Sequence, residues 1–145
     1  MKRIDIESSS VQSYLQILQG VISRMASNSA ACKTWCIALV TAIIVVLAEK
    51  ETGKYVWISA VPIILLCLLD AYYLGLERSF CSLYNGFIGK LHGGVATVED
   101  IFVVAPTSGL RETLTVTLKA LTSISVWPFY ILLCTMLVVL RIWVL

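Results

Sequence analysis

Three long stretches of the chain are almost free of charged residues. They cover residues 34–48, 55–76 and 120–140, and the second is interrupted only by Asp70. A helix needs about 20 apolar residues to cross the hydrocarbon core of a bilayer. The second and third stretches meet this length, and the first meets it if the Lys33 side chain extends to the interface. The pattern predicts three transmembrane helices.

The segment before the first stretch has a different periodicity. Between residues 11 and 29, apolar side chains recur at spacings of three and four, which is typical of an amphipathic helix. The opposite face lacks the lysines expected of a helix that lies on anionic lipid. We therefore expect this helix to pack on a partner helix or on its own copies. Its apolar positions are Val11, Tyr14, Leu15, Leu18, Val21, Ile22 and Met25.

Between the second and third stretches the chain becomes polar and mixed, and its glycines are expected to break it into short pieces. Residues 101–105 are apolar and β-branched and precede a turn, which predicts a buried strand. Residues 113–118 alternate as in a strand, yet leucines spaced for a helix overlap them, so both assignments stay open. The glycines are at positions 86, 89, 93, 94 and 109, and the leucines are Leu110, Leu114, Leu118 and Leu121.

Together these patterns predict an all-α membrane protein with three transmembrane helices, an amphipathic N-terminal helix and a small cytoplasmic mixed α/β subdomain. Its parts are residues 1–32 (cytoplasmic amphipathic helix), 33–76 (transmembrane hairpin), 77–119 (cytoplasmic sensor-like segment) and 120–145 (third transmembrane helix). Four lysines and arginines precede the first span, two follow it, and four lie between the second and third. This distribution predicts a cytoplasmic N-terminus and a cytoplasmic middle segment.

Composition agrees with a lipid environment. Of the 145 residues, 59% are apolar and 14% are charged, whereas typical globular domains are about 25% charged; the mean hydropathy is +0.89. So small a domain cannot bury this much apolar surface in a core of its own. We therefore expect the excess apolar surface to face a bilayer and other copies of the chain in a homo-oligomer, which we expect to contain four copies. The net charge of +2 is too small for nucleic-acid binding across the whole chain.

The chain offers little material for catalysis. Its five cysteines are an odd number without a CxxC pair, and the single histidine cannot serve a site that needs two. We read the cysteines as buried free thiols. No nucleophile-elbow, phosphate-loop or zinc-protease motif is present in the sequence. We therefore expect no enzyme, no catalytic residue, no metal site and no cofactor.

Asp70 is an acidic residue within an apolar helix, where an ionised carboxylate is costly unless it is paired or hydrated. One interpretation is a pore, because copies of this helix around an axis would form carboxylate rings that attract cations. The alternative is structural: Asp70 lies at the cytoplasmic interface and bonds Arg78, a neighbouring helix or tyrosine hydroxyls. On a helix, the face predicted to line the pore or gate carries Ser59, Leu66, Asp70, Tyr73 and Glu77.

Basic residues in the expected cytoplasmic parts could form a pocket once subunits assemble. Aromatic side chains lie among them and could stack on bases, as in single-strand and nucleotide sites. The alternative is that these cations only set the membrane topology. The candidate ligand-binding residues are Arg24, Lys33, Arg78, Tyr84, Lys90, His92, Arg111 and Lys119.

Two motifs carry a resemblance to a known family. The first is ISRMASNS at residues 22–29, followed by Lys33, Thr34 and Trp35; the second is LDAYYL at residues 69–74, followed by ERSF at 77–80 and LY at 83–84. Their order resembles the SLATT family of bacterial membrane effectors, which accompany nucleotidyltransferases and nucleotide-sensing domains in anti-phage defence. The resemblance covers residues 20–88, about half of the chain.

The resemblance implies a membrane pore or perforating effector that is held quiet or opened by a nucleotide or oligonucleotide signal from a partner nucleotidyltransferase and that arrests or kills the infected cell. Together with the pore interpretation of Asp70, it predicts a cation-conducting pore in the bacterial inner membrane. It also implies that Arg24, Asn28, Lys33, Asp70 and Glu77 belong to a shared structural core. Two rival interpretations stay open. One is a holin-like or toxin-like membrane protein that needs no ligand, and the other is a non-conducting scaffold that anchors a cytoplasmic enzyme.

Overall fold

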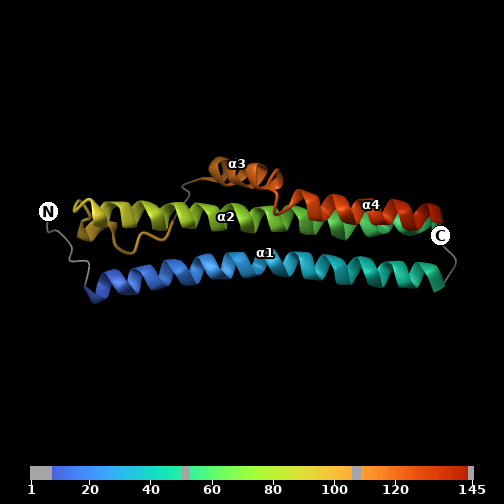
Figure 1. Cartoon of the computed structure of the whole chain (residues 1–145), viewed down its shortest axis with the longest axis horizontal. Helices are drawn as coiled ribbons and strands as arrows, with labels where there is room; N and C mark the ends of the chain where they lie inside the picture. The colour runs from blue at the N-terminus through green and yellow to red at the C-terminus, as the bar shows by residue number, and fades with distance from the viewer. Residues whose placement is uncertain (1–7, 50–52, 106–108, 144–145) are drawn as a thin grey trace.

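The computed structural model describes residues 8–49, 53–105 and 109–143, and all regular elements in these ranges are helical. Two long helices form an antiparallel hairpin (Figure 1): α1 (Ser9–Glu49) and α2 (Ala60–His92), with the 3₁₀ helix η1 (Gly53–Ser59) at the start of α2. At about 1.5 Å per residue, α1 is about 60 Å long, which is twice the hydrocarbon thickness of a bilayer. The hairpin is thus long enough to cross a bilayer and to extend well beyond it.

Two shorter helices return along α2 (Figure 1). Helix α3 (Leu110–Leu121) packs against α2 and follows the short 3₁₀ helix η2 (Val98–Asp100), and α4 (Trp127–Trp143) contacts both α2 and η1. Helix α3 approaches α2 closely at Gly75, where an added Cβ would lie 3.2 Å from backbone atoms of Val116 and Thr117. Helix α4 therefore lies beside η1 and α2.

The bundle divides into two halves along its length. We call residues 34–49, 53–76 and 127–143 the apolar half, and residues 8–33, 77–105 and 109–126 the polar half. The polar half has its own buried cluster, made by Val11, Tyr14, Leu18, Phe80, Phe87, Leu91 and Ala96. A second cluster fills the apolar half and its border, made by Cys36, Val40, Val56, Ile63, Ala71, Leu74, Ala120, Val126, Tyr130 and Leu137.

The apolar half exposes large hydrophobic side chains on its outer surface. The most apolar windows of α1 and of Tyr55–His92 are only 17% and 33% buried, and both helices are long and apolar enough to cross a membrane. A core helix of a water-soluble protein would be mostly buried instead. Helix α4 is apolar but shorter. Its exposed side chains include Ile131, Leu132 and Met136.

The N-terminal amphipathic helix packs on a partner helix, which was one of the two expected arrangements. The partner is α2 of the same chain. Val11, Tyr14 and Leu18 are buried, while the other predicted apolar positions are partly buried against them. The helix continues without a break through the predicted boundary at residues 32 and 33. The amphipathic segment and the first apolar stretch are therefore two parts of one helix.

The prediction for residues 77–119 was wrong in two places. Gly86 and Gly89 do not break the chain, because they lie inside α2, whose packing against α1 outweighs the low helix propensity of glycine. Residues 101–105 form no buried strand: they are irregular and mostly exposed, and Phe102 has a φ of 66°. The described residues of this segment thus give a helical and irregular region in place of a mixed α/β subdomain.

The assignment of residues 113–118, left open by the sequence, is now decided: they belong to α3 and are helical. The third apolar stretch was predicted to form one helix from residue 120, and this was wrong, because α3 ends at Leu121 and α4 begins only at Trp127. The intervening turn is closed by backbone hydrogen bonds to Ser123 and Ala120 carbonyls.

Candidate functional site

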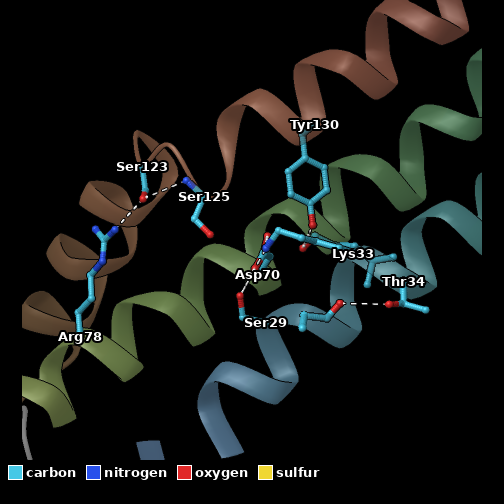
Figure 2. Close-up of polar contacts among 10 residues, drawn as sticks. Ser29, Lys33, Thr34, Asp70, Arg78, Ser123, Ser125 and Tyr130 are labelled. Carbon is cyan, nitrogen blue, oxygen red and sulfur yellow. Dashed lines mark hydrogen bonds and ion pairs between the residues drawn. The ribbon is translucent and has the colours of Figure 1, made fainter. Parts of the chain in front are cut away.

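A buried ion pair joins α1 and α2 at the border between the two halves (Figure 2). The side chain of Asp70 is fully buried, and its Oδ2 lies 2.6 Å from Lys33 Nζ as an ion pair without hydrogen-bond geometry. Ser29 Oγ donates a hydrogen bond of 2.5 Å to Asp70 Oδ1. Ser29 and Lys33 are four residues apart on α1, so both side chains lie on the face toward α2.

Each carboxylate oxygen of Asp70 therefore has a partner from α1. A buried charge is tolerated only when it is paired and hydrogen-bonded, and loss of one partner is costly. The sequence left three structural alternatives for the partners of Asp70, and the structure shows that they come from the neighbouring helix, α1. Arg78 instead donates to Ser123 Oγ at 2.6 Å, and the Tyr130 hydroxyl donates to the Leu66 carbonyl at 3.1 Å.

The other residues of the predicted pore face extend along α2 and η1. Ser59 is fully buried at the far end of the apolar half, and its hydroxyl has no hydrogen-bond partner among the described residues. Leu66 packs against the buried cluster of the apolar half. Tyr73 and Glu77 are half-buried. Within one chain, Ser59 and Asp70 therefore face the interior of the bundle.

The polar half contains a cavity of about 530 Å³ between α2, α3 and the segment after η2. Its wall combines two cations, two carboxylates and two serine hydroxyls with an apolar floor. The lining residues are Tyr14, Arg78, Ser79, Ser82, Leu83, Gly86, Phe87, Lys90, Asp100, Val103, Glu112 and Val116. The cavity thus has the mixed character of sites that orient a small ligand with a few polar groups.

The segment 97–103 forms one wall of this cavity and is fixed at two points. The Tyr14 hydroxyl donates a 2.6 Å hydrogen bond to the Val103 carbonyl. The Tyr14 ring packs edge-on against Phe87 and Phe102, with centroid distances of 4.8 and 5.9 Å. At the other point, Lys90 Nζ lies 2.5 Å from Asp100 Oδ1. Aromatic packing and an ion pair thus hold the segment against α1 and α2.

Electrostatics at the second point favour the ionised carboxylate. The hydrogen bond from Lys90, together with those from the Thr97 backbone and hydroxyl, lowers the pKa of Asp100 to about 2. The Thr97 backbone N–H and hydroxyl donate to Asp100 Oδ2 at 2.9 and 3.0 Å. Burial, with a smaller contribution from Asp100, raises the pKa of Tyr14. Tyr14 therefore stays protonated and remains a hydrogen-bond donor.

The cavity brings together only part of the predicted ligand set. Arg78 and Lys90 line it. Tyr84 accepts a 3.2 Å hydrogen bond from Gln19 instead, and Lys33 belongs to the buried ion pair. The remaining predicted residues are exposed and do not line this cavity: Arg24, His92, Arg111 and Lys119.

Sequence reasoning missed most of the cavity lining, including Tyr14, Asp100 and Glu112. Tyr14 was assigned to helix packing only, and Asp100 and Glu112 were not among the candidate residues. A signal for Asp100 was present, because Thr97 and Asp100 have the spacing of a capping box, in which the two residues bond one another. No local signal places Tyr14 and Glu112 at one cavity, since they are distant in sequence.

The described residues contain no group of three histidine, cysteine or carboxylate side chains placed to hold a metal ion. All five cysteines are free thiols, as expected, but only Cys32 and Cys36 are buried. Cys67 and Cys81 are half-buried and Cys134 is exposed, so the expectation of burial was wrong for Cys134, which lies on the exposed surface of α4. Comparisons of the chain with known protein families, with characterised proteins and with solved structures found no match. The features that bear on function are therefore the ion pair, the cavity and the exposed apolar surface.

Proposed function

We propose that this chain is a pore-forming effector of the bacterial inner membrane that acts as a homo-oligomer. The observation that carries the proposal is the division of one continuous hairpin into an apolar half with exposed hydrophobic side chains and a polar half with a buried core. A surface of exposed leucine, isoleucine, valine and tryptophan is stable against lipid and unfavourable in water. The border between the halves carries the buried ion pair.

In the proposed topology, the N-terminus and the polar half are cytoplasmic and three helices cross the membrane. The distribution of lysines and arginines supports this orientation. Helix α4 has 17 residues and is about 25 Å long, which is close to the hydrocarbon thickness of about 30 Å. Trp127 and Trp143 at its ends are the residue type that anchors helices at membrane interfaces.

The pore is proposed to switch between two states at the ion pair. In the closed state, Lys33 and Ser29 hold the Asp70 carboxylate inside the single chain. In the open state, Asp70 turns toward the axis of the oligomer, where water and cations replace Lys33 as its partners. A separated charge pair in hydrocarbon is costly, so separation favours a hydrated path.

The cavity of the polar half is the proposed site of the gating signal. Arg78 and Lys90 would bind the phosphates of a nucleotide or oligonucleotide from a partner nucleotidyltransferase, a ligand class that rests on the resemblance to the SLATT family. Two contacts support coupling of the cavity to the apolar half: Arg78 bonds Ser123 in the turn before α4, and α3 touches Gly75. The ligand must bind one state more tightly to shift the equilibrium.

A non-conducting scaffold is the second candidate, and one observation favours it. Asp70 is fully buried and paired within one chain, so in this conformation it offers no carboxylate to a pore. In that case the polar half would anchor a cytoplasmic enzyme, and ion retention would stay normal at any expression level.

Cation flux from liposomes tests the proposal. Purified protein is reconstituted, and flux is measured with and without the nucleotide product of the partner nucleotidyltransferase. We expect flux that changes with the ligand and falls in Asp70→Asn. Flux that ignores the ligand would favour the holin-like alternative, and absence of flux under all conditions would favour the scaffold.

A matched control separates conduction from folding. In Glu99→Gln, an exposed carboxylate of η2, outside the predicted pore face and outside the cavity lining, loses its charge, so flux is expected to stay near the wild-type value. In the exchanged variant Lys33→Asp/Asp70→Lys, the pair is kept but the carboxylate moves to α1. If this variant folds and conducts as the wild type does, the specific role of the Asp70 carboxylate is wrong.

A further inference from the structure

Among the described residues that line the cavity of the polar half, the charged side chains cancel one another. Arg78 and Lys90 are cations, whereas Asp100 and Glu112 are carboxylates. Hydrogen bonds that lower the pKa of Asp100 to about 2 keep its carboxylate ionised at neutral pH. A phosphate group that enters this wall is attracted by the two cations and repelled by the two carboxylates. Binding of a phosphate is therefore favoured when one carboxylate moves away.

The two cations of the cavity have different acceptors. Arg78 donates to the neutral hydroxyl of Ser123 at 2.6 Å. Lys90 is paired with a carboxylate, because its Nζ lies 2.5 Å from Asp100 Oδ1. The Lys90 side chain is 53% exposed, so a ligand can reach its ammonium group from the solvent. A carboxylate and a phosphate offer the same kind of acceptor, a charged oxygen. Asp100 thus occupies the position at Lys90 that a phosphate oxygen would take.

The segment that carries Asp100 is suited to displacement. Its regular part, η2, is three residues long, and residues 102–105 are exposed. Movement of these four residues therefore removes little apolar area from contact with the rest of the protein. Phe102 has a φ of 66°, which is a costly conformation for a bulky side chain. Movement of the segment can relieve this strain.

We propose that Asp100 is an internal competitor at the cavity, and that a phosphate-bearing ligand displaces it from Lys90 and releases segment 97–103. This proposal rests on the proposed function, because it takes the cavity as the site of the gating signal. The ligand binds the displaced conformation more tightly, since the wall then has two cations and one carboxylate. Such a difference in affinity between two states shifts their equilibrium. The pair of Lys90 and Asp100 thereby sets the ligand concentration at which the segment is released.

The test measures binding of inorganic pyrophosphate to the full-length protein in detergent at physiological ionic strength. Pyrophosphate has two phosphate groups and no base, so it probes competition at the two cations alone. Asp100→Asn removes the competing charge and is expected to bind pyrophosphate about fivefold more tightly, which is the upper range for a solvent-exposed ion pair. Isothermal titration calorimetry measures the dissociation constants of the variant and the wild type.

Glu99 provides a matched control for this substitution. It precedes Asp100 in η2, is exposed and does not line the cavity. Glu99→Gln changes the net charge of the protein by the same amount as Asp100→Asn, and it is expected to bind pyrophosphate as the wild type does. Equal affinities of the two variants overturn the proposal, because Asp100 would then not compete with phosphate.

Hydrogen exchange of the wild type gives a second readout that needs no variant. Pyrophosphate is expected to speed amide exchange in residues 97–103, because the segment loses its ion pair with Lys90. Slower exchange in these residues contradicts the proposal, since the ligand would then hold the segment more firmly against the cavity.

Arg78→Gln separates this proposal from the proposed function. If Arg78→Gln abolishes binding but Asp100→Asn binds no more tightly than the wild type, the cavity stays the site of the signal and only the competition is wrong. If pyrophosphate binds the wild type and Arg78→Gln equally, or binds neither the wild type nor Asp100→Asn, the cavity is not a phosphate site. The signal site and the competition then fail together, while conduction is still tested by cation flux.

Discussion

The two halves of the α1–α2 hairpin use the same pair of helices in opposite ways. In the polar half the large side chains of Tyr14, Leu18 and Phe87 lie between α1 and α2 and belong to the buried cluster. In the apolar half many of the largest side chains lie outside: Trp35 is 63% exposed and Leu65 is 62% exposed, whereas Cys36 and Asp70 are buried. The helices continue unchanged, and only the distribution of apolar groups around them differs.

This difference supports the proposed topology, in which one half of the hairpin contacts lipid and the other half contacts water. Burial of large apolar groups drives helix association in water, where it removes them from the solvent. Lipid gives no such advantage, so helices in a bilayer associate through small residues, close packing and polar contacts. The ion pair lies at the border between the half that packs through large buried side chains and the half that packs through small and polar ones. Four changes below test this comparison, in order of expected effect.

Lys33→Met is expected to have the largest effect. It leaves the fully buried Asp70 without its cation, and an uncompensated buried charge costs about 3–5 kcal/mol of unfolding free energy. Unfolding in detergent, followed by circular dichroism, measures the loss. Arg24→Met removes an exposed cation from the same helix and should change the free energy by no more than about 0.5 kcal/mol. Equal effects of the two variants would mean that the ion pair between Lys33 and Asp70 does not stabilise the fold.

Glycines on the two sides of the border should respond with opposite signs. In Gly75→Ala the new Cβ lies 3.2 Å from the backbone of α3, so α3 must shift at a cost of about 1–3 kcal/mol. In Gly86→Ala the Cβ meets nothing within 4 Å, and the better helix former should stabilise α2 by about 0.5–1 kcal/mol. The same unfolding measurement compares them. A neutral Gly75→Ala would contradict the close packing of α3 on α2.

Two buried tyrosines, one in each half, donate to backbone carbonyls and form the third comparison. Tyr14→Phe removes the bond to Val103, should cost about 0.5–1.5 kcal/mol, and should speed amide hydrogen exchange in residues 101–105. Tyr130→Phe removes the bond to Leu66, inside α2, and should leave exchange in that segment unchanged. Similar exchange in both variants would show that Tyr14 does not hold the segment.

Acidification should produce the smallest effect, confined to the polar half. Because the pKa of Asp100 is lowered from 3.8 to about 2, the folded state binds a proton less readily than the unfolded state. The contribution of Asp100 to the free energy of unfolding is complete above pH 3.8 and is lost as the pH falls to about 2. The amide resonance of Thr97, followed by NMR, should titrate in this window in the wild type and not in Asp100→Asn. An identical titration in both proteins would exclude Asp100 as the group responsible.

Part of this architecture was predictable from local patterns. The spacing of Val11, Tyr14 and Leu18 predicted a buried helical face, and the structure confirms it. The length of the first two apolar stretches predicted helices able to cross a membrane, and α1 and α2 have that length and composition. Both signals are contained in windows of about 20 residues, which is why the sequence alone reveals them.

The failures arose where a long-range contact overrides a local signal. Residues 101–105 have the composition of a strand, but Tyr14 holds this segment through Val103 and packs against Phe102. Gly86 signals a break, but the packing of α2 on α1 keeps the helix intact. In both cases the deciding partner lies far away in the sequence.

The candidate site shows the same division. The sequence alone marked Asp70 as a carboxylate that needs compensation in an apolar helix. It placed Lys33 among the candidate ligand residues, and only the family resemblance grouped Lys33 with Asp70 in a structural core. Nothing in the sequence identified Ser29 as a partner of Asp70. Only the antiparallel packing of α1 on α2 brings these groups together, across 41 positions for Ser29 and Asp70. Amphipathicity and helix length are local properties of a sequence, whereas the compensation of a buried charge depends on which surfaces meet when the chain folds.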